Sequence, residues 1–345
     1  KGEFLVFEQW RKIVNRLEEF EQSYGLWPSP PDLRDYQFKV FAGTLALPQA
    51  FSRKSEMPPV RDQGKLGTCV GHAACAIKEW QERQQGDNPE GGLSPRFIYA
   101  LAKQQDGIPS QAGTYPRVAL KVVQEYGDCP ERVFPYGELT SDVNLSPPPA
   151  DVVAAAKPYK ISTYARLNNL GEVKRAIVEQ GPVLLGITVC ENFMQAKDYI
   201  PEPEGYVYGG HAIVACAYDD NIKLGPYTGG VLLQNSWGTS WAQNGYCWLP
   251  YEAWNWMIDR DIGWPFIMEA WTCVDVPFTP KMARQILLKL NNPTAFVDGE
   301  YVQLDVPPTV IGSRTLLPIR FVAERMGYLV SWHPENSLVE LRRPY

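Results

Sequence analysis

A cysteine and a glutamine early in the sequence are residue types that acyl transfer requires. Cys69 stands where a helical pattern begins over residues 68–84, after a loop that contains Gly64 and Gly67. The unpaired backbone N–H groups and the dipole of a helix N-terminus favour the thiolate form of such a cysteine. Gln63 lies just upstream and offers a side-chain amide N–H. The pair therefore predicts a nucleophile beside an oxyanion donor.

A thiolate nucleophile needs an imidazole, and the sequence has only three histidines: His72, His211 and His333. His211 opens an apolar run that is typical of a buried strand, and Asn235 ends a second such run. His211 follows Cys69 by about 140 residues, within the window of roughly 130–150 that one class of catalytic cysteines keeps from its histidine. We therefore expect His211 to be the partner of Cys69.

A metal site is the alternative reading of the same helix, because Cys69, His72 and Cys75 lie at positions i, i+3 and i+6. Residues i and i+3 share a helix face, but residue i+6 lies off that face, and no fourth ligand is apparent. We therefore predict a packed helix, no metal and no cofactor. His72 is not expected to replace His211 as the base, because a neighbour on the helix points along it rather than across a cleft.

Short segments spread through the chain carry a family resemblance. They are Gln63-Gly64 with Gly67-Thr68-Cys69, then Gly113-Thr-Tyr-Pro116 with Ala119-Leu120 and Tyr126-Gly127, then Pro135-Tyr136, Gly181-Pro182-Val183, Gly210-His211-Ala212, and Asn235-Ser-Trp-Gly-Thr-Ser-Trp241 with Asn244-Gly-Tyr246. In order and type they resemble the motifs of papain-family cysteine peptidases. The resemblance implies an α+β, two-lobed fold with a helical lobe and a β-barrel-like lobe.

The resemblance also implies a mechanism for peptide hydrolysis. Cys69 would attack the peptide carbonyl, with His211 as its imidazolium partner and Asn235 orienting the imidazole. Gln63 and the Cys69 backbone N–H would hold the oxyanion. Two alternatives remain open, namely a catalytically silent binding protein on the same fold and a transpeptidase-like acyl transfer.

The loop that contains Gly113 is expected to bind substrate. By the resemblance, Gly113 and Thr114 would pair with the backbone of an extended substrate. Tyr115 and Pro116 would wall the pocket for the second residue before the cut. Thr114 departs from the second glycine that is more usual in the family.

Three further residues complete the predicted substrate site. Gly186 falls where the family lines the same specificity pocket, which would leave that pocket roomy. Gly210 precedes His211 and is assigned to substrate binding. Trp237 is expected to cover the hydrogen bond between His211 and Asn235 from water.

Composition limits the other partners. The chain has 345 residues, 45% of them hydrophobic, which fits about two domains of about 150 residues with sizeable cores. The net charge is −6 and no basic stripe is present, which argues against a nucleic-acid partner. No apolar run approaches the roughly 18 residues of a membrane span. The chain begins with Lys1, and we expect a processed product whose signal peptide is out of view.

The sequence has seven cysteines, which fits one free nucleophile and six others. Those six are either bridged or reduced core residues. Plant and animal members of the family usually have a disulfide near the nucleophile, and its two positions are Leu66 and about Gln111 here. That bridge is therefore absent, and no disulfide is assigned.

The N-terminal part, residues 1–46, is predicted to be a helix and an extended linker. Apolar residues recur at helical spacing over residues 4–24, and Gly25 and Pro28 end the pattern. One interpretation is a helix packed on the protein body, and the other is the remnant of an inhibitory prosegment. We expect the helix to dock on the body and to leave the cleft open.

The sequence changes character after Pro277 and Pro280, which mark a linker. We therefore place the peptidase domain at residues 47–278. Residues 284–345 alternate β-like runs with turns around one helix, and they predict a small α+β module. His333 is expected to be a surface turn residue.

The module carries a second resemblance. The matching strings are Val297-Asp-Gly299, Pro307-Pro-Thr, Arg314-Thr-Leu-Leu-Pro-Ile-Arg-Phe-Val-Ala-Glu324 and Val330-Ser-Trp332. They resemble the small domain named after the N-terminal region of copper amine oxidases, which carries no copper itself. Because that module recurs on secreted and cell-surface bacterial proteins, the resemblance implies such a location and attachment to the cell envelope.

Overall fold

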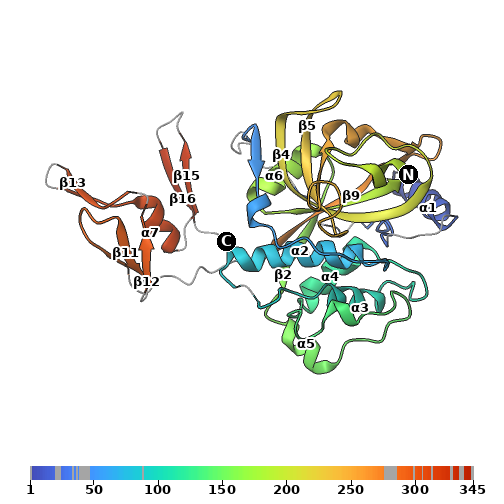
Figure 1. Ribbon diagram of the computed structural model, residues 1–345, viewed down its shortest axis with the longest axis horizontal. Helices are drawn as coiled ribbons and strands as arrows, with labels where there is room; N and C mark the ends of the chain where they lie inside the picture. Colours follow the sequence, from blue (N-terminus) through green and yellow to red (C-terminus); the bar gives the residue numbers. More distant parts are fainter. Residues whose placement is uncertain are drawn as a thin grey trace. The chain divides into compact units, whose positions relative to one another are not determined.

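The computed structural model describes residues 2–19, 25–32, 35, 38, 47–87, 89–275, 286–297, 300–304, 306–311, 314–326, 329–333 and 338–342. The chain divides into two compact units, Lys1–Val276 and Pro277–Tyr345 (Figure 1). Each unit is described by itself. Among the described residues, no helix is long and apolar enough to cross a bilayer.

The first unit has a helical lobe. Its helices are α2 (Cys69–Gln84), α3 (Pro95–Lys103), α4 (Pro116–Glu125) and α5 (Ala150–Ala156). Proline at the first position of α3 and α4 favours helix initiation, because its missing N–H would have no partner there. The Ser94 side chain caps α3 by accepting a hydrogen bond from the Phe97 backbone N–H.

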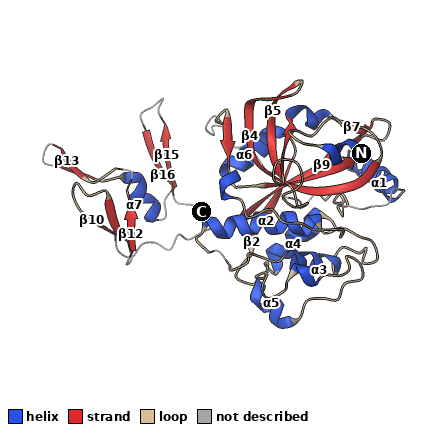
Figure 2. Cartoon of the chain, in the orientation of Figure 1, coloured by secondary structure: helices blue, strands red, loops and turns tan. Residues whose placement is uncertain are grey.

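The second lobe of this unit is a seven-stranded antiparallel sheet in the order β2-β9-β3-β4-β5-β6, with β1 paired to β4. The strands are β1 (Ala50–Ser52), β2 (Ile161–Leu167), β3 (Val183–Cys190), β4 (Val207–Leu224), β5 (Tyr227–Gln234), β6 (Tyr246–Pro250) and β9 (Ile267–Asp275). Strands β7 (Met257–Asp259) and β8 (Trp264–Pro265) form a small separate pair, and α6 (Leu170–Glu179) precedes β3. Figure 2 shows the helix-rich and strand-rich lobes, which confirm the predicted two-lobed α+β fold.

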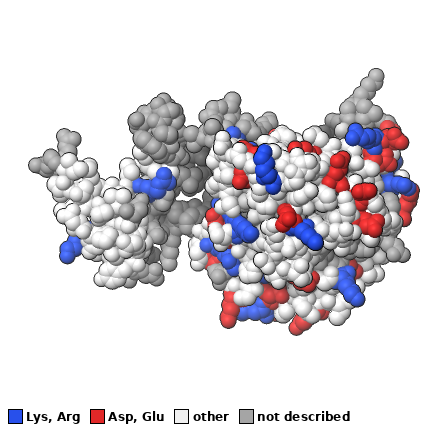
Figure 3. Space-filling model, turned by 45° about the horizontal axis from the view of Figure 1, so that its top comes forward, with Lys and Arg blue, Asp and Glu red and all other residues white. Residues whose placement is uncertain are grey.

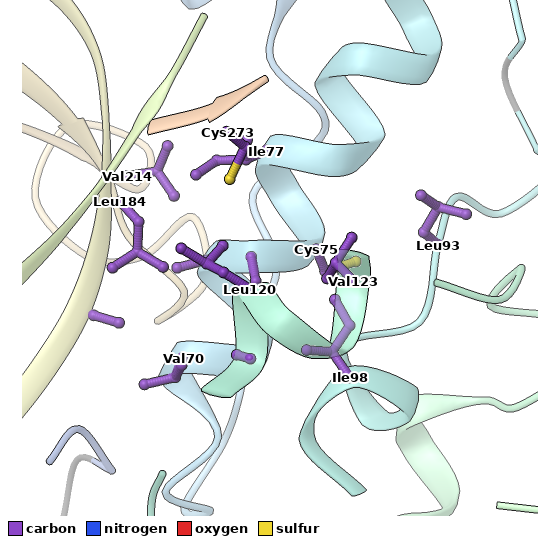
Figure 4. Packing of buried hydrophobic residues seen from close by; sticks show 14 of the residues in the cluster. Val70, Cys75, Ile77, Leu93, Ile98, Leu120, Val123, Leu184, Val214 and Cys273 are labelled. Carbon is purple, nitrogen blue, oxygen red and sulfur yellow. The ribbon is translucent and has the colours of Figure 1, made fainter. Parts of the chain in front are cut away.

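Helix α2 is the element that joins the two lobes. Its buried residues Val70, Cys75 and Ile77 belong to one core cluster with residues of α3, α4 and the sheet. Figure 4 shows Ile77 of α2 facing Leu184 of β3 and Val214 of β4. Because α2 is buried on both sides, its first residue is fixed where the lobes meet.

Helix α1 (Gly2–Glu18) docks on the first unit, as predicted. Ile13 and Leu17 are buried in a cluster with Trp27 and Trp264. Residues 20–24 of the predicted helix lie outside the described residues. The chain that follows at Gly25 is extended, and its course is described with the site.

The second unit is built from short strands and one helix. Strands β10 (Ile286–Leu288), β11 (Thr294–Val297) and β12 (Glu300–Gln303) form a three-stranded sheet. Two strand pairs follow, namely β13 (Thr309–Ile311) with β14 (Arg314–Leu316), and β15 (Leu329–His333) with β16 (Leu338–Arg342). Helix α7 (Ile319–Arg325) lies between the pairs in sequence. The buried core of Ala295, Val297 and Leu304 is small, as expected for a short module.

Charged side chains are dispersed over the surface in view. On the face drawn in Figure 3, Lys and Arg are interspersed with Asp and Glu over the described residues of the first unit. This pattern is typical of a solvated surface that carries both signs of charge.

Candidate active site

Cys69 is the first residue of α2 and is completely buried. Its Sγ accepts a hydrogen bond from the Ala212 backbone N–H at 3.3 Å. Burial raises the pKa of the Cys69 thiol to about 12, although the backbone N–H groups of Ala212, Val70 and Cys69 itself lower it. The helix N-terminus was expected to favour the thiolate, but in this state desolvation outweighs that effect.

His211 and Asn235 come together from adjacent strands of the sheet. His211 lies in β4, Asn235 directly follows β5, and the His211 Nε2 to Asn235 Oδ1 distance is 2.7 Å. Asn235 Oδ1 also accepts the Ser236 backbone N–H at 2.8 Å, so this atom is the oxygen of the amide. His211 Nε2 must therefore carry the proton, and Nδ1 is the ring nitrogen that remains to exchange a proton with Cys69.

Aromatic rings surround His211. The ring of Trp237, which is predicted to shield the His211–Asn235 hydrogen bond, lies 4.8 Å from the His211 ring, centroid to centroid. Phe193 packs against both Trp237 and Trp241. The sequence analysis did not find Phe193, which lies in a short 3-10 helix after β3 and has no periodic pattern to mark it.

Gln63 reaches the site from the loop before α2. Its Nε2–H donates to Leu66 O at 2.9 Å, and its Oε1 accepts from Ser236 Oγ at 2.7 Å. The Gln63 backbone N–H donates to Ser236 O at 2.8 Å. Since a side-chain amide has two N–H donors, a second Nε2–H remains for a substrate oxygen. Gln63 is thereby held next to Asn235 through Ser236.

Residues Gly25–Ser29, which we call the strap, run between the segments predicted to bind substrate. The Leu26 N–H donates to Gly210 O at 3.0 Å, and the Trp27 N–H donates to Thr114 O at 3.1 Å. The Thr114 N–H donates to Gly25 O at 3.0 Å. The linker after α1 therefore fills the groove, and the expectation of an open cleft is wrong.

Glycines allow the strap to approach this closely. A Cβ at Gly186 would lie 2.9 Å from Leu26 Cδ1, and one at Gly210 would lie 2.2 Å from Leu26 O. Gly113 and Gly25 have positive φ angles of 85° and 91°, and their backbones are in direct contact. The predicted substrate-site glycines thus lie where a chain passes, and the Leu26 side chain packs against Gly186.

Glu269 also lies against Gly186 and was not found from the sequence. It pairs with Gly186 in the register of β9 and β3, and its side chain is buried. Its Oε1 accepts the Ser29 backbone N–H at 2.9 Å, and its Oε2 accepts the Trp271 Nε1–H at 2.6 Å. One carboxylate oxygen therefore helps to hold the strap.

Tyr115 and Pro116 lie at the start of α4. Pro116 is buried at the first turn of that helix. Tyr115 packs against the cluster formed by Ile13, Leu17, Trp27 and Trp264. The predicted pocket wall therefore borders the strap at Trp27 and the docked helix α1.

All seven cysteines are described, and all are buried free thiols. The described residues include no group of three His, Cys, Asp or Glu side chains placed to hold a metal ion. The side chains of the predicted cluster offer a thiol, an imidazole and two amides.

Both units of the chain are similar to known proteins. Residues 47–260 match the family described as papain family cysteine protease, and residues 276–341 match the copper amine oxidase N-terminal domain. An uncharacterized peptidase C1-like protein of Acanthamoeba polyphaga mimivirus is 29% identical over 224 residues, covering 60% of this chain and 67% of the relative. Cysteine proteinase 3 of Entamoeba histolytica is 26% identical over 72% of this chain and 77% of its own length.

Solved structures agree with the family match. Xylellain, a cysteine protease from Xylella fastidiosa, superposes with a TM-score of 0.63 at 26% identity, covering 74% of this chain and 97% of its own. Procathepsin B S9 from Trypanosoma congolense has a TM-score of 0.58 at 15% identity, over 77% of this chain and 98% of its own, and supports the fold alone. The chain belongs to the papain family of cysteine peptidases, with a copper amine oxidase N-terminal domain after the peptidase domain.

Proposed function

We propose that the chain is a cysteine endopeptidase that the strap holds in a latent state. The proposed catalytic cluster is Gln63, Cys69, His211 and Asn235. The observation that carries the proposal is the strap in the groove of this cluster. There the backbone groups of Thr114 and Gly210, which are proposed to bind a substrate backbone, pair with an extended segment of the chain itself.

The proposed reaction uses each side chain once the strap has left. Cys69 Sγ gives its proton to His211 Nδ1 and attacks the peptide carbonyl, while Asn235 holds the imidazolium through Nε2–H. The Gln63 amide and the Cys69 backbone N–H stabilise the oxyanion. His211 then protonates the leaving amine and activates water to hydrolyse the thioester.

Latency follows from competition for the same groups. The strap uses the carbonyl of Gly210 and both backbone groups of Thr114, which are the groups proposed to bind a substrate backbone. A substrate and the strap therefore cannot bind together. Burial of the Cys69 thiol in the strapped state adds a second obstacle, because the thiol form is a poor nucleophile.

Peptide turnover tests the proposal. The full chain and its Gly25→Ala variant are incubated with a fluorogenic peptide library, and the products are analysed with and without an added amine. Hydrolysis that disappears in Cys69→Ala is the expected result. Absence of turnover in both chains would favour the silent binding protein, and transfer to the amine would favour the transpeptidase.

We also propose that the second unit attaches the peptidase to a cell envelope, which places the protein at a cell surface or outside the cell. The match of residues 276–341 to the copper amine oxidase N-terminal domain supports this proposal. Sedimentation with isolated bacterial envelopes tests it, because the full chain should sediment and a chain ending near residue 280 should not.

A further inference from the structure

A small cavity lies between α2 and the strands that carry His211 and Asn235. His72, Ala73 and Ala76 of α2 line it on one side, and Ala212, Asn235 and Ser236 line it on the other. Its volume is about 20 Å³. A cavity needs roughly 10–15 Å³ to hold one water molecule, together with polar partners for that water. Arg61, Glu79 and Gln234 also line the cavity, but among its polar residues His72 and Asn235 are those with a buried polar atom that has no hydrogen-bond partner among the described residues.

Asn235 supplies a donor. Its Oδ1 is occupied by the His211 Nε2–H and the Ser236 N–H. Its Nδ2 is buried and has no hydrogen-bond partner among the described residues. A buried amide N–H without a partner costs free energy, so a site for an acceptor is expected beside it.

His72 supplies an acceptor. Its Nδ1 lies 3.1 Å from Thr68 O, and because a carbonyl can only accept, Nδ1 carries the proton. Burial, assisted by the nearby charges of Arg61 and His211, lowers the pKa of His72 to about 3, so its ring is neutral at physiological pH. Its Nε2 is therefore an acceptor, and it too is buried without a partner among the described residues.

We propose that one water molecule in this cavity accepts from Asn235 Nδ2–H and donates to His72 Nε2. His72 is then a positioning residue, which acts on His211 through the Asn235 amide. The inference rests on the proposed roles of His211 and Asn235.

The bridge has a physical consequence for the site. A rotated Asn235 amide would turn its NH₂ group toward two other donors, the His211 Nε2–H and the Ser236 N–H. The chain from His72 through water to Asn235 Nδ2 stabilises the opposite, productive orientation. Packing alone does not account for His72, because its edge-to-face contact with Tyr136 at 4.5 Å would serve a phenylalanine equally well.

Three substitutions of His72 distinguish the loss of its Nε2 hydrogen-bond acceptor from the loss of its packing. His72→Phe keeps a ring and removes the acceptor. His72→Asn has an amide that reaches only the position of Nδ1, whereas the amide of His72→Gln reaches the position of Nε2. Each is made in the full chain that carries Gly25→Ala, so that turnover does not depend on release of the strap, and melting temperatures are compared.

The measured quantities are kcat and KM for peptide hydrolysis. We expect kcat to fall about tenfold in His72→Phe and His72→Asn with KM within about twofold, and to stay within about threefold of the parent in His72→Gln. Equal kcat in the Phe and Gln variants, or losses that follow melting temperature alone, would overturn the inference.

A crystal structure of the full chain that resolves ordered water decides the point independently of turnover. The expected result is one water within hydrogen-bond distance of both Asn235 Nδ2 and His72 Nε2. An empty cavity, or a water that touches neither atom, overturns the bridge. If the water is present but no chain hydrolyses peptides, the proposed function fails while the bridge stands.

Discussion

The proposed catalytic cluster and the strap meet at Gly210 and His211, but they are held in place by different kinds of contact. The cluster depends on side chains, such as the amide of Asn235 against His211. The strap pairs backbone groups with Thr114 and Gly210, and it also buries the side chains of Leu26 and Trp27. Side-chain chemistry is specific to a residue type, whereas backbone pairing is open to any extended peptide. The cluster is therefore sensitive to loss of a functional group, and the strap is sensitive to loss of its close fit.

Removing the nucleophile tests the side-chain half of this comparison and has the largest expected effect. Cys69→Ala should lower kcat/KM for peptide hydrolysis by at least about 10³-fold, because it removes the proposed nucleophile. The matched control is Cys216→Ala, which removes another fully buried thiol and should leave kcat/KM within about twofold. Activity that survives in Cys69→Ala would remove the basis of the whole cluster.

Adding one methyl group at Gly25 tests whether the strap depends on its close fit. A Cβ at Gly25 would lie 2.0 Å from Gly67 O, and Gly25 has a φ of 91°, so alanine there forces the strap away from the groove. We expect kcat/KM of Gly25→Ala to rise about tenfold, equal to about 1.4 kcal/mol of strap binding. Gly86→Ala is the control, because Gly86 also has positive φ but has open space around it. An increase in both variants, or in neither, would contradict the latent state.

The pH dependence of Cys69 alkylation tests whether the strap controls the reactivity of the proposed nucleophile. With the strap in place the pKa of Cys69 is about 12, so the thiolate fraction should rise about tenfold for each pH unit between pH 6 and 9. Alkylation of Cys69 by iodoacetamide, followed by mass spectrometry, should show that rise in the full chain. In Gly25→Ala the relief of burial lowers the pKa, so alkylation at pH 6 should be faster and the slope shallower. Identical slopes would show that the strap does not control the thiol.

The same contrast explains what the sequence could predict. Cys69, His211 and Asn235 could be proposed from the sequence because a helix start and two apolar runs leave local patterns, and α2 begins within one residue of its predicted start. The strap was read as a linker, because its partners Thr114 and Gly210 are distant in sequence and any residue can supply backbone hydrogen bonds.

The other differences between the sequence-based predictions and the structure arise from burial and contacts in the folded chain. The pKa of Cys69 depends on how completely the folded chain excludes water from the thiol, which no local pattern records. Glu269 faces the strap only through the register of β9 on β3. Phe193 reaches Trp237 only when β3 and β4 are paired.

Removal of the second unit should change peptide hydrolysis least. All the residues of the proposed cluster and of the strap lie in the unit Lys1–Val276, which is compact by itself. A chain ending near residue 280 should therefore hydrolyse small peptides at a similar rate, in both the wild-type and Gly25→Ala backgrounds. The measurement is kcat/KM at matched concentrations of folded protein. A loss greater than about tenfold, or about 1.4 kcal/mol of barrier, would mean that the second unit shapes the groove. An increase confined to the wild-type background would instead mean that it helps to hold the strap, and the backbone contacts with Thr114 and Gly210 would then not suffice for latency.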